Sequence, residues 1–137
     1  MSYRTTVNRD GIELVTDWKT IRQWKSPKDG SFLLFYQCKA TNNMRYNVLV
    51  SFRMKVNGST VMQTGHNISW DAHYGCYTLP YVGSFLEGDL VEVQARAASE
   101  AGMPDYAAMI PREGTEHESL IAVALSDYWY ISSKLTA

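Results

Sequence analysis

The sequence predicts an all-β protein, an antiparallel β-sandwich of about eight short strands. Strict alternation of apolar and polar residues is the first observation, and it is clearest from Leu90 to Ala98, where Glu92, Gln94 and Arg96 separate small apolar side chains. Such a period of two is typical of a strand with one buried and one solvated face. Clusters of turn-forming residues separate similar segments about every 10–15 residues, as expected for a sandwich or barrel.

The N-terminal third is expected to contain an arm and two strands. Residues 1–17 are assigned to a short N-terminal arm. Trp18 to Trp24 favours a strand, with a single helical turn as the alternative. Phe32 to Ala40 begins apolar on both faces and then alternates, directly after the turn formers of residues 26–31, which predicts a strand.

A hairpin is expected in the middle of the chain. From Tyr46 to Val56 every second side chain is apolar, with Leu49 as the exception on the polar face. Asn57-Gly58 follows, and this dipeptide tolerates the positive φ angles of a type I′ turn. Ser59 to Thr64 should therefore pair back on the end of the preceding strand.

The C-terminal half predicts four more strands around one long loop. The loop from Ser99 to Glu118 has no sustained period. Gly102 and Pro104 interrupt the alanine-rich piece from Ala95 to Ala108, so a long helix is excluded there and one helical turn at 105–109 is the most that is expected. Loops of this length in small domains are usually functional or mobile. The four strands are expected at Gly75 to Val82, Leu90 to Ala98, Ser119 to Ser126 and Tyr128 to Leu135.

Composition indicates one soluble domain covering residues 1–137, without nucleic-acid or membrane partners. The formal net charge is −1, so no global field steers the chain to nucleic acid or an anionic surface. No apolar run could span a bilayer, and no signal peptide precedes the domain, so synthesis in a cytoplasm is expected. Cys38 and Cys76 lie in apolar segments and are expected to be buried, reduced thiols.

The sequence carries no recognisable catalytic motif, which predicts a protein that is not an enzyme and uses no cofactor or metal. The strongest candidate for chemistry is the set His66, Asp71 and His73, whose side chains are of the types that bind a divalent metal. The favoured interpretation is an exposed polar loop between strands.

Aromatic residues gather in two regions that suit contact surfaces. Trp70, His73 and Tyr74 would form a ligand-binding surface for a cell-surface glycan. Tyr128 and Trp129 would belong to a protein interface, where tyrosine and tryptophan are enriched.

Three segments of the chain together resemble the C-terminal half of jelly-roll domains of the tumour-necrosis-factor and complement C1q type. They are the Gly-x-Tyr strand at Gly75 to Tyr77, the Leu-x-x-Gly-Asp-x-Val strand within Phe85 to Val93, and the apolar strand Ser119 to Leu125. The resemblance implies a jelly roll whose last apolar strand lies near a threefold axis. That strand is apolar on both faces, so either a loop or another subunit must cover the second face. The expected trimer interface is Leu120, Ile121, Val123, Leu125, Tyr128 and Trp129.

Domains of this kind are also similar to bacteriophage virion proteins such as head decoration proteins, fibre or needle tips and receptor-binding heads. The leading hypothesis is a trimeric, non-enzymatic virion protein, made in the host cytoplasm, that binds a capsid or tail surface. Residues Ser2 to Asp17 would form its docking arm. One alternative is a receptor- or carbohydrate-binding head of a phage tail fibre or spike. The second is a small metal-dependent β-sandwich enzyme.

Overall fold

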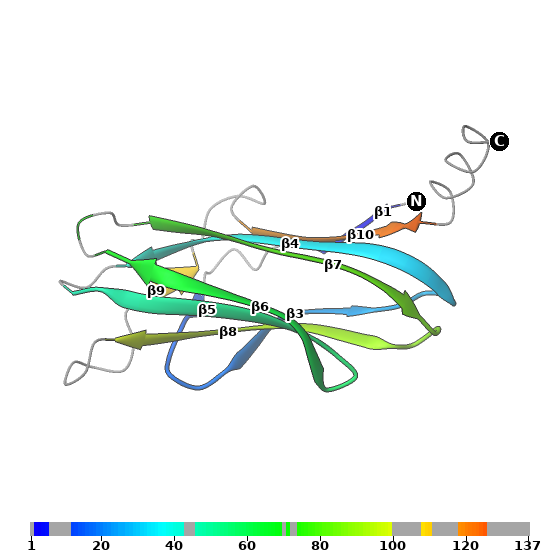
Figure 1. The fold of residues 1–137 in the computed structure, drawn as a ribbon, viewed down its shortest axis with the longest axis horizontal. Coiled ribbons are helices and arrows are strands. Elements are labelled where there is room, and N and C mark those ends of the chain that lie inside the picture. The colour runs from blue at the N-terminus through cyan, green and yellow to red at the C-terminus, as the bar shows by residue number, and fades with distance from the viewer. Residues whose placement is uncertain are drawn as a thin grey trace.

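Two antiparallel β-sheets pack face to face in the computed structural model of the chain (Figure 1). The structure describes residues 2–5, 12–42, 46–69, 71, 74–99, 108–110 and 118–125. The predicted all-β sandwich is confirmed. Sheet A has the order β1 (Ser2–Thr5), β10 (Glu118–Ala124), β4 (Gly30–Asn42), β9 (Ala108–Ile110), β2 (Ile12–Glu13), with β7 (Tyr74–Phe85) also paired to β4. Sheet B has the order β3 (Lys19–Lys25), β8 (Leu90–Ser99), β5 (Val48–Val56), β6 (Ser59–Ile68).

The strands expected from the sequence are present wherever the chain is described, and three short ones add to them. Residues 19–25 form a strand, which excludes the alternative of a helical turn there. Within the long loop, Ala108–Ile110 pairs with β2 and β4, so the helical turn expected at 105–109 is wrong for its last two residues. The strand expected at Tyr128 to Leu135 lies outside the described residues.

The core forms between the sheets because the alternating apolar residues face inward. Phe32, Leu34 and Tyr36 of β4 are fully buried against sheet B. On sheet B, Phe52 lies directly opposite Ala95 in the β5–β8 register, so a large side chain is accommodated beside a small one. Its ring also lies 5.8 Å from that of Tyr36. Close packing of this kind joins the two sheets into one core.

A network of hydrogen bonds ties the turn of the β5–β6 hairpin to the turn that leads from β7 in sheet A to β8 in sheet B, at one end of the sandwich. Asn57 and Gly58 have φ angles of 48° and 87°, as the predicted type I′ turn requires. The Asn57 amide donates to an Asp89 carboxylate oxygen at 3.0 Å, while its carbonyl oxygen accepts from the Leu90 backbone N–H. The second Asp89 oxygen accepts from the Leu86 backbone N–H at 2.8 Å.

These contacts should make stability depend on pH through Asp89. The Leu86 backbone N–H, and then the Asn57 amide, lower the pKa of this carboxyl group in the folded protein. The carboxylate therefore stabilises the fold above about pH 4, where unfolded aspartate is ionised, and this contribution is lost as pH falls through the lower folded pKa. We expect the thermal unfolding midpoint of Asp89→Asn to fall less steeply than that of the wild type below about pH 4. Parallel curves in a thermal scan across pH would contradict this role.

The described part of the N-terminal arm belongs to the sandwich. Ser2–Thr5 pairs with β10, Leu14 is fully buried in the core, and the Val15 carbonyl accepts from the Ala97 backbone N–H at 2.8 Å. The protein therefore uses this segment to close its own fold.

One expectation about the cysteines is wrong. Cys38 is buried as expected, but Cys76 is exposed. The β4–β7 register explains the difference, because Cys76 lies opposite Lys39 on the outer face of sheet A, whereas Cys38 lies opposite Tyr77 on the inner face.

Candidate functional site

The outer face of sheet A, which points away from sheet B, carries an apolar surface. The strand register places its side chains in two adjacent rows, each crossing β10, β4 and β7. Residues directly opposite each other on antiparallel strands project to the same face. We call the following residues the apolar face: Leu33, Val82 and Val123 in one row, and Phe35, Pro80 and Ile121 in the next.

The side chains of the apolar face keep part of their surface exposed in the single subunit, and Val82 keeps the most among its large aliphatic members. Val82 is 59% exposed, while Leu33, Phe35, Ile121 and Val123 are half-buried. This accounts for the segments that are apolar on both faces in the sequence. One side of each strand fills the core, and the other side forms this surface.

A polar row borders the apolar face. Gln37, Thr78 and Ser119 lie opposite one another on β4, β7 and β10, with Thr78 exposed and Ser119 fully buried, and the Gln37 amide donates to the Ser119 hydroxyl at 3.2 Å. The apolar surface therefore covers only part of the sheet, with an ordered polar boundary. This pattern of an apolar patch beside polar residues is typical of a protein interface.

One residue of the expected trimer interface lies in the subunit's own core, and further apolar side chains lie beside the others on the outer face of sheet A. Leu120 is 1% exposed and packs in the subunit's own core, so it has no surface left for a partner. Ile121 and Val123 lie on the apolar face, and Leu125 is half-buried just beyond β10. Tyr128 and Trp129 lie outside the described residues. The sequence did not predict Phe35 or Val82 as part of this surface. The segment from Phe32 to Ala40 begins apolar on both faces, and this pattern was a signal for Phe35.

The expected glycan surface is described only at Tyr74. This side chain is 54% exposed at the start of β7, and the Lys39 ammonium group lies 4.2 Å from its ring centroid. Trp70 and His73 lie outside the described residues.

The metal alternative has two described members, His66 and Asp71. The imidazole of His66 stacks on the Tyr77 ring at 4.0 Å, and its Nε2 lies 3.0 Å from the Cys76 carbonyl oxygen. Asp71 accepts a hydrogen bond from the Ser69 hydroxyl. Across the ranges that the structure describes, no three His, Cys, Asp or Glu side chains gather as metal ligands. His73 is outside those ranges.

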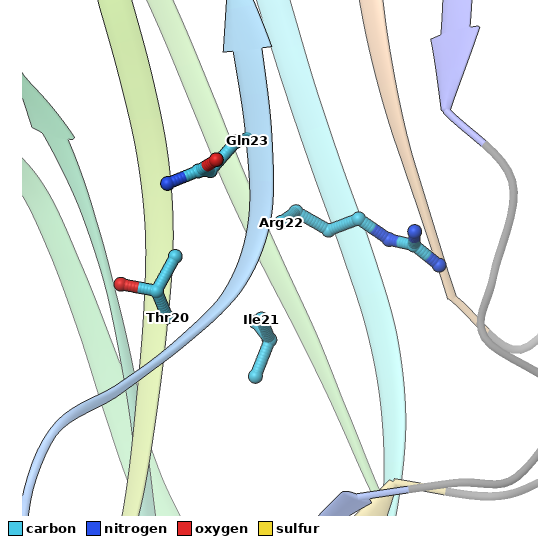
Figure 2. A pocket seen from close by; sticks show the side chains of 4 residues that line it. All are labelled: Thr20, Ile21, Arg22 and Gln23. Atoms are coloured by element: carbon cyan, nitrogen blue, oxygen red, sulfur yellow. The ribbon is translucent and has the colours of Figure 1, made fainter.

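A buried ion pair joins the two sheets. Arg22 of β3 extends toward β10, as Figure 2 shows, and its Nη2 donates to Glu118 at 2.6 Å while its Nε donates to the same carboxylate at 2.7 Å. Glu118 is 3% exposed and the Arg22 side chain 14%. This bidentate geometry is the strongest form of arginine–carboxylate contact.

The polar groups beside this pair are poor candidates for catalysis. Burial, followed by the nearby Cys38 and Glu118, raises the pKa of Tyr36 well above its usual value. Burial also raises the pKa of the Cys38 thiol to about 12. A thiol with this pKa is protonated at neutral pH and is a weak nucleophile. The cluster therefore suits a structural role.

Comparison with known proteins supports the fold. No family model matches the sequence, and no curated protein is significantly similar to it. Among solved structures, the chain is similar to the Eiger TNF from S. frugiperda, with a TM-score of 0.64 and 11% sequence identity, over 92% of each chain. The TNF-like jelly-roll fold expected from the sequence is thus confirmed. No helix in the described part of the chain could cross a membrane.

Proposed function

We propose that this protein is a non-enzymatic structural component of a virion that assembles as a homotrimer through the apolar face. The apolar face is the observation that carries the proposed assembly. Exposed apolar patches of this continuity on soluble proteins usually mark contact with another macromolecule. A second copy of the chain offers the same six side chains, and a closed ring of subunits would remove all of them from water.

The trimer itself gives the first prediction. We expect light scattering over a hundredfold concentration range to give a mass three times the 15.5 kDa of the chain. Val82→Glu should yield folded monomers, because burying an unpaired carboxylate in the interface is unfavourable while the side chain is already exposed in the single subunit. Ile121→Glu should act in the same way.

Leu86 provides a matched control for this experiment. It is 66% exposed, like Val82, but follows β7 at the end of the sandwich, away from the apolar face. Leu86→Glu should remain trimeric. A wild-type monomer at every concentration would overturn the assembly proposal. A stable dimer would overturn the trimer and indicate twofold symmetry instead. If Val82→Glu still forms trimers, the subunits must associate through a surface other than the apolar face.

The virion role needs a separate test. We expect the protein to copurify with density-gradient-purified particles from infected cells, at a copy number divisible by three. Absence from such particles would contradict this role while leaving the trimer standing. Particle binding by a chain lacking residues 1–5 tests the arm, because this deletion retains Leu14 in the core.

A further inference from the structure

We propose that the outer face of sheet B contains a binding site for the acidic groups of a polysaccharide, formed by Arg53 and Arg96 around Trp18. This face lies on the opposite side of the sandwich from the apolar face, so the site remains open if subunits join through sheet A (Figure 1). The inference does not depend on the oligomer or on the virion role.

Trp18 holds two cations together on this face. The Arg53 guanidinium carbon lies 4.2 Å from a ring centroid of Trp18, and that of Arg96 lies 4.5 Å from it. Arg53 comes from β5 and Arg96 from the adjacent β8, where their register partners are Gln94 and Ser51. Cation–π contact stabilises each guanidinium group but leaves its N–H edges able to donate. Two fork-shaped donors are thus placed close together.

A directional chain of hydrogen bonds orients Arg53. Its Nε donates to the Gln94 carbonyl oxygen at 2.8 Å, the Gln94 amide donates to the Thr20 hydroxyl at 3.1 Å, and that hydroxyl donates to Glu92 at 3.1 Å. Figure 2 shows Thr20 and Gln23 directed away from Arg22, on the side of β8. Nε is occupied, and no described residue hydrogen-bonds to the terminal nitrogens of Arg53, so these are available to a ligand.

The charge on this face favours an anion. Neither Arg53 nor Arg96 forms an ion pair with a carboxylate of a described residue. The ion pair that the described residues do form joins Arg22 to Glu118. Lys55 adds a third positive charge on the same face of β5. Glu92 is the acidic residue opposite Lys55, and Thr20 already donates to it. The protein as a whole is nearly neutral, so this local excess of positive charge stands out.

The surroundings suit a sugar chain. The guanidinium fork matches a carboxylate or sulfate in bidentate geometry. On β6, Gln63 lies opposite Arg53. Gly65 lies opposite Ser51, the register partner of Arg96, and Asn67 follows two residues later on the same strand. Amide groups that can bond sugar hydroxyls therefore flank the cations. Three positive charges are few for nucleic acid, whose affinity comes from many phosphate contacts. An acidic polysaccharide fits this mixture of few charges and several neutral donors better.

The test is titration calorimetry of the whole protein with three tetrasaccharides at low salt. We expect binding of a heparin-derived tetrasaccharide or of tetragalacturonate, and none of neutral maltotetraose. Tetragalacturonate carries carboxylates alone, whereas the heparin fragment carries both sulfates and carboxylates, so binding of tetragalacturonate would show that carboxylates suffice, and binding of the heparin fragment alone would show that sulfates are needed. Arg53→Gln and Arg96→Gln should each weaken binding by about tenfold or more. Binding should also weaken as salt increases, because part of the attraction is screened.

Control variants distinguish loss of the site from a general change in charge, folding or oligomeric state. Lys28→Gln removes a positive charge from an exposed residue at the end of the sandwich and should change affinity by less than about twofold. Arg53→Lys retains charge without the fork and should bind at an intermediate level, even if a glutamine variant fails to fold. Light scattering should give the same mass for the variants and the wild type. The site would be overturned if neither acidic probe binds, or if single-stranded oligothymidine binds instead. It would also be overturned if both glutamine variants bind the acidic probes as tightly as the wild type does.

Discussion

Replacing Arg22 with methionine should destabilise the folded protein by about 3–5 kcal/mol, because it leaves the Glu118 carboxylate buried without a partner. Glu118 is 3% exposed and receives three hydrogen-bond contacts from the guanidinium group. Urea unfolding followed by tryptophan fluorescence, at fixed pH and protein concentration, measures the effect.

Two further variants separate the ion pair from other contributions of Arg22. Lys25→Met removes an exposed positive charge from the same strand and should cost less than about 0.5 kcal/mol. The double variant Arg22→Met with Glu118→Leu removes both charges and should recover most of the loss. If Arg22→Met alone costs less than about 1 kcal/mol, the ion pair does not hold the sheets together.

Phe52→Ala should cost about 3–5 kcal/mol through a cavity at the centre of the sandwich. Phe52 is fully buried on β5, and its ring lies 4.9 Å from that of Tyr77 and 5.8 Å from that of Tyr36. Its partner across the strands is Ala95, whose small side chain cannot fill the space. Total stabilities of small domains are about 5–15 kcal/mol, so the variant should be close to unfolding at 25 °C.

A graded series tests this explanation. Phe52→Leu keeps most of the volume and should cost roughly 1–2 kcal/mol. Leu86→Ala, at an exposed position, should cost less than about 0.5 kcal/mol. Equal effects of the alanine and leucine variants at Phe52 would mean that cavity volume does not determine the loss.

Local pattern was sufficient to predict most of the strands. In β5 and β8 the apolar side chains alternate, so the inward face could be assigned directly. Asn57 and Gly58 specified the hairpin between β5 and β6 because few dipeptides accept two positive φ angles. By contrast, β1, β2 and β9 have two to four residues each, too few for a period to be read.

The candidate sites were predicted less completely, because they depend on which strands become neighbours. The apolar character of Ile121 and Val123 was visible, but their alignment with Phe35 and Val82 follows from the pairing of β10, β4 and β7. The cysteine prediction failed at Cys76 for the same reason. Its apolar sequence context gave no sign that its side of β7 faces outward.

By itself, the sequence determined the strands, the turn at Asn57 and which side chains of each strand are apolar, because these follow from conformational preferences and periods within a few residues. Only the tertiary structure decided what lies beside each strand. It brought Arg22 to Glu118 across 96 residues of chain, and placed Trp18 over Arg53 and Arg96. Such contacts arise from packing between distant segments, where burial of apolar surface and pairing of polar groups in the whole domain select one arrangement.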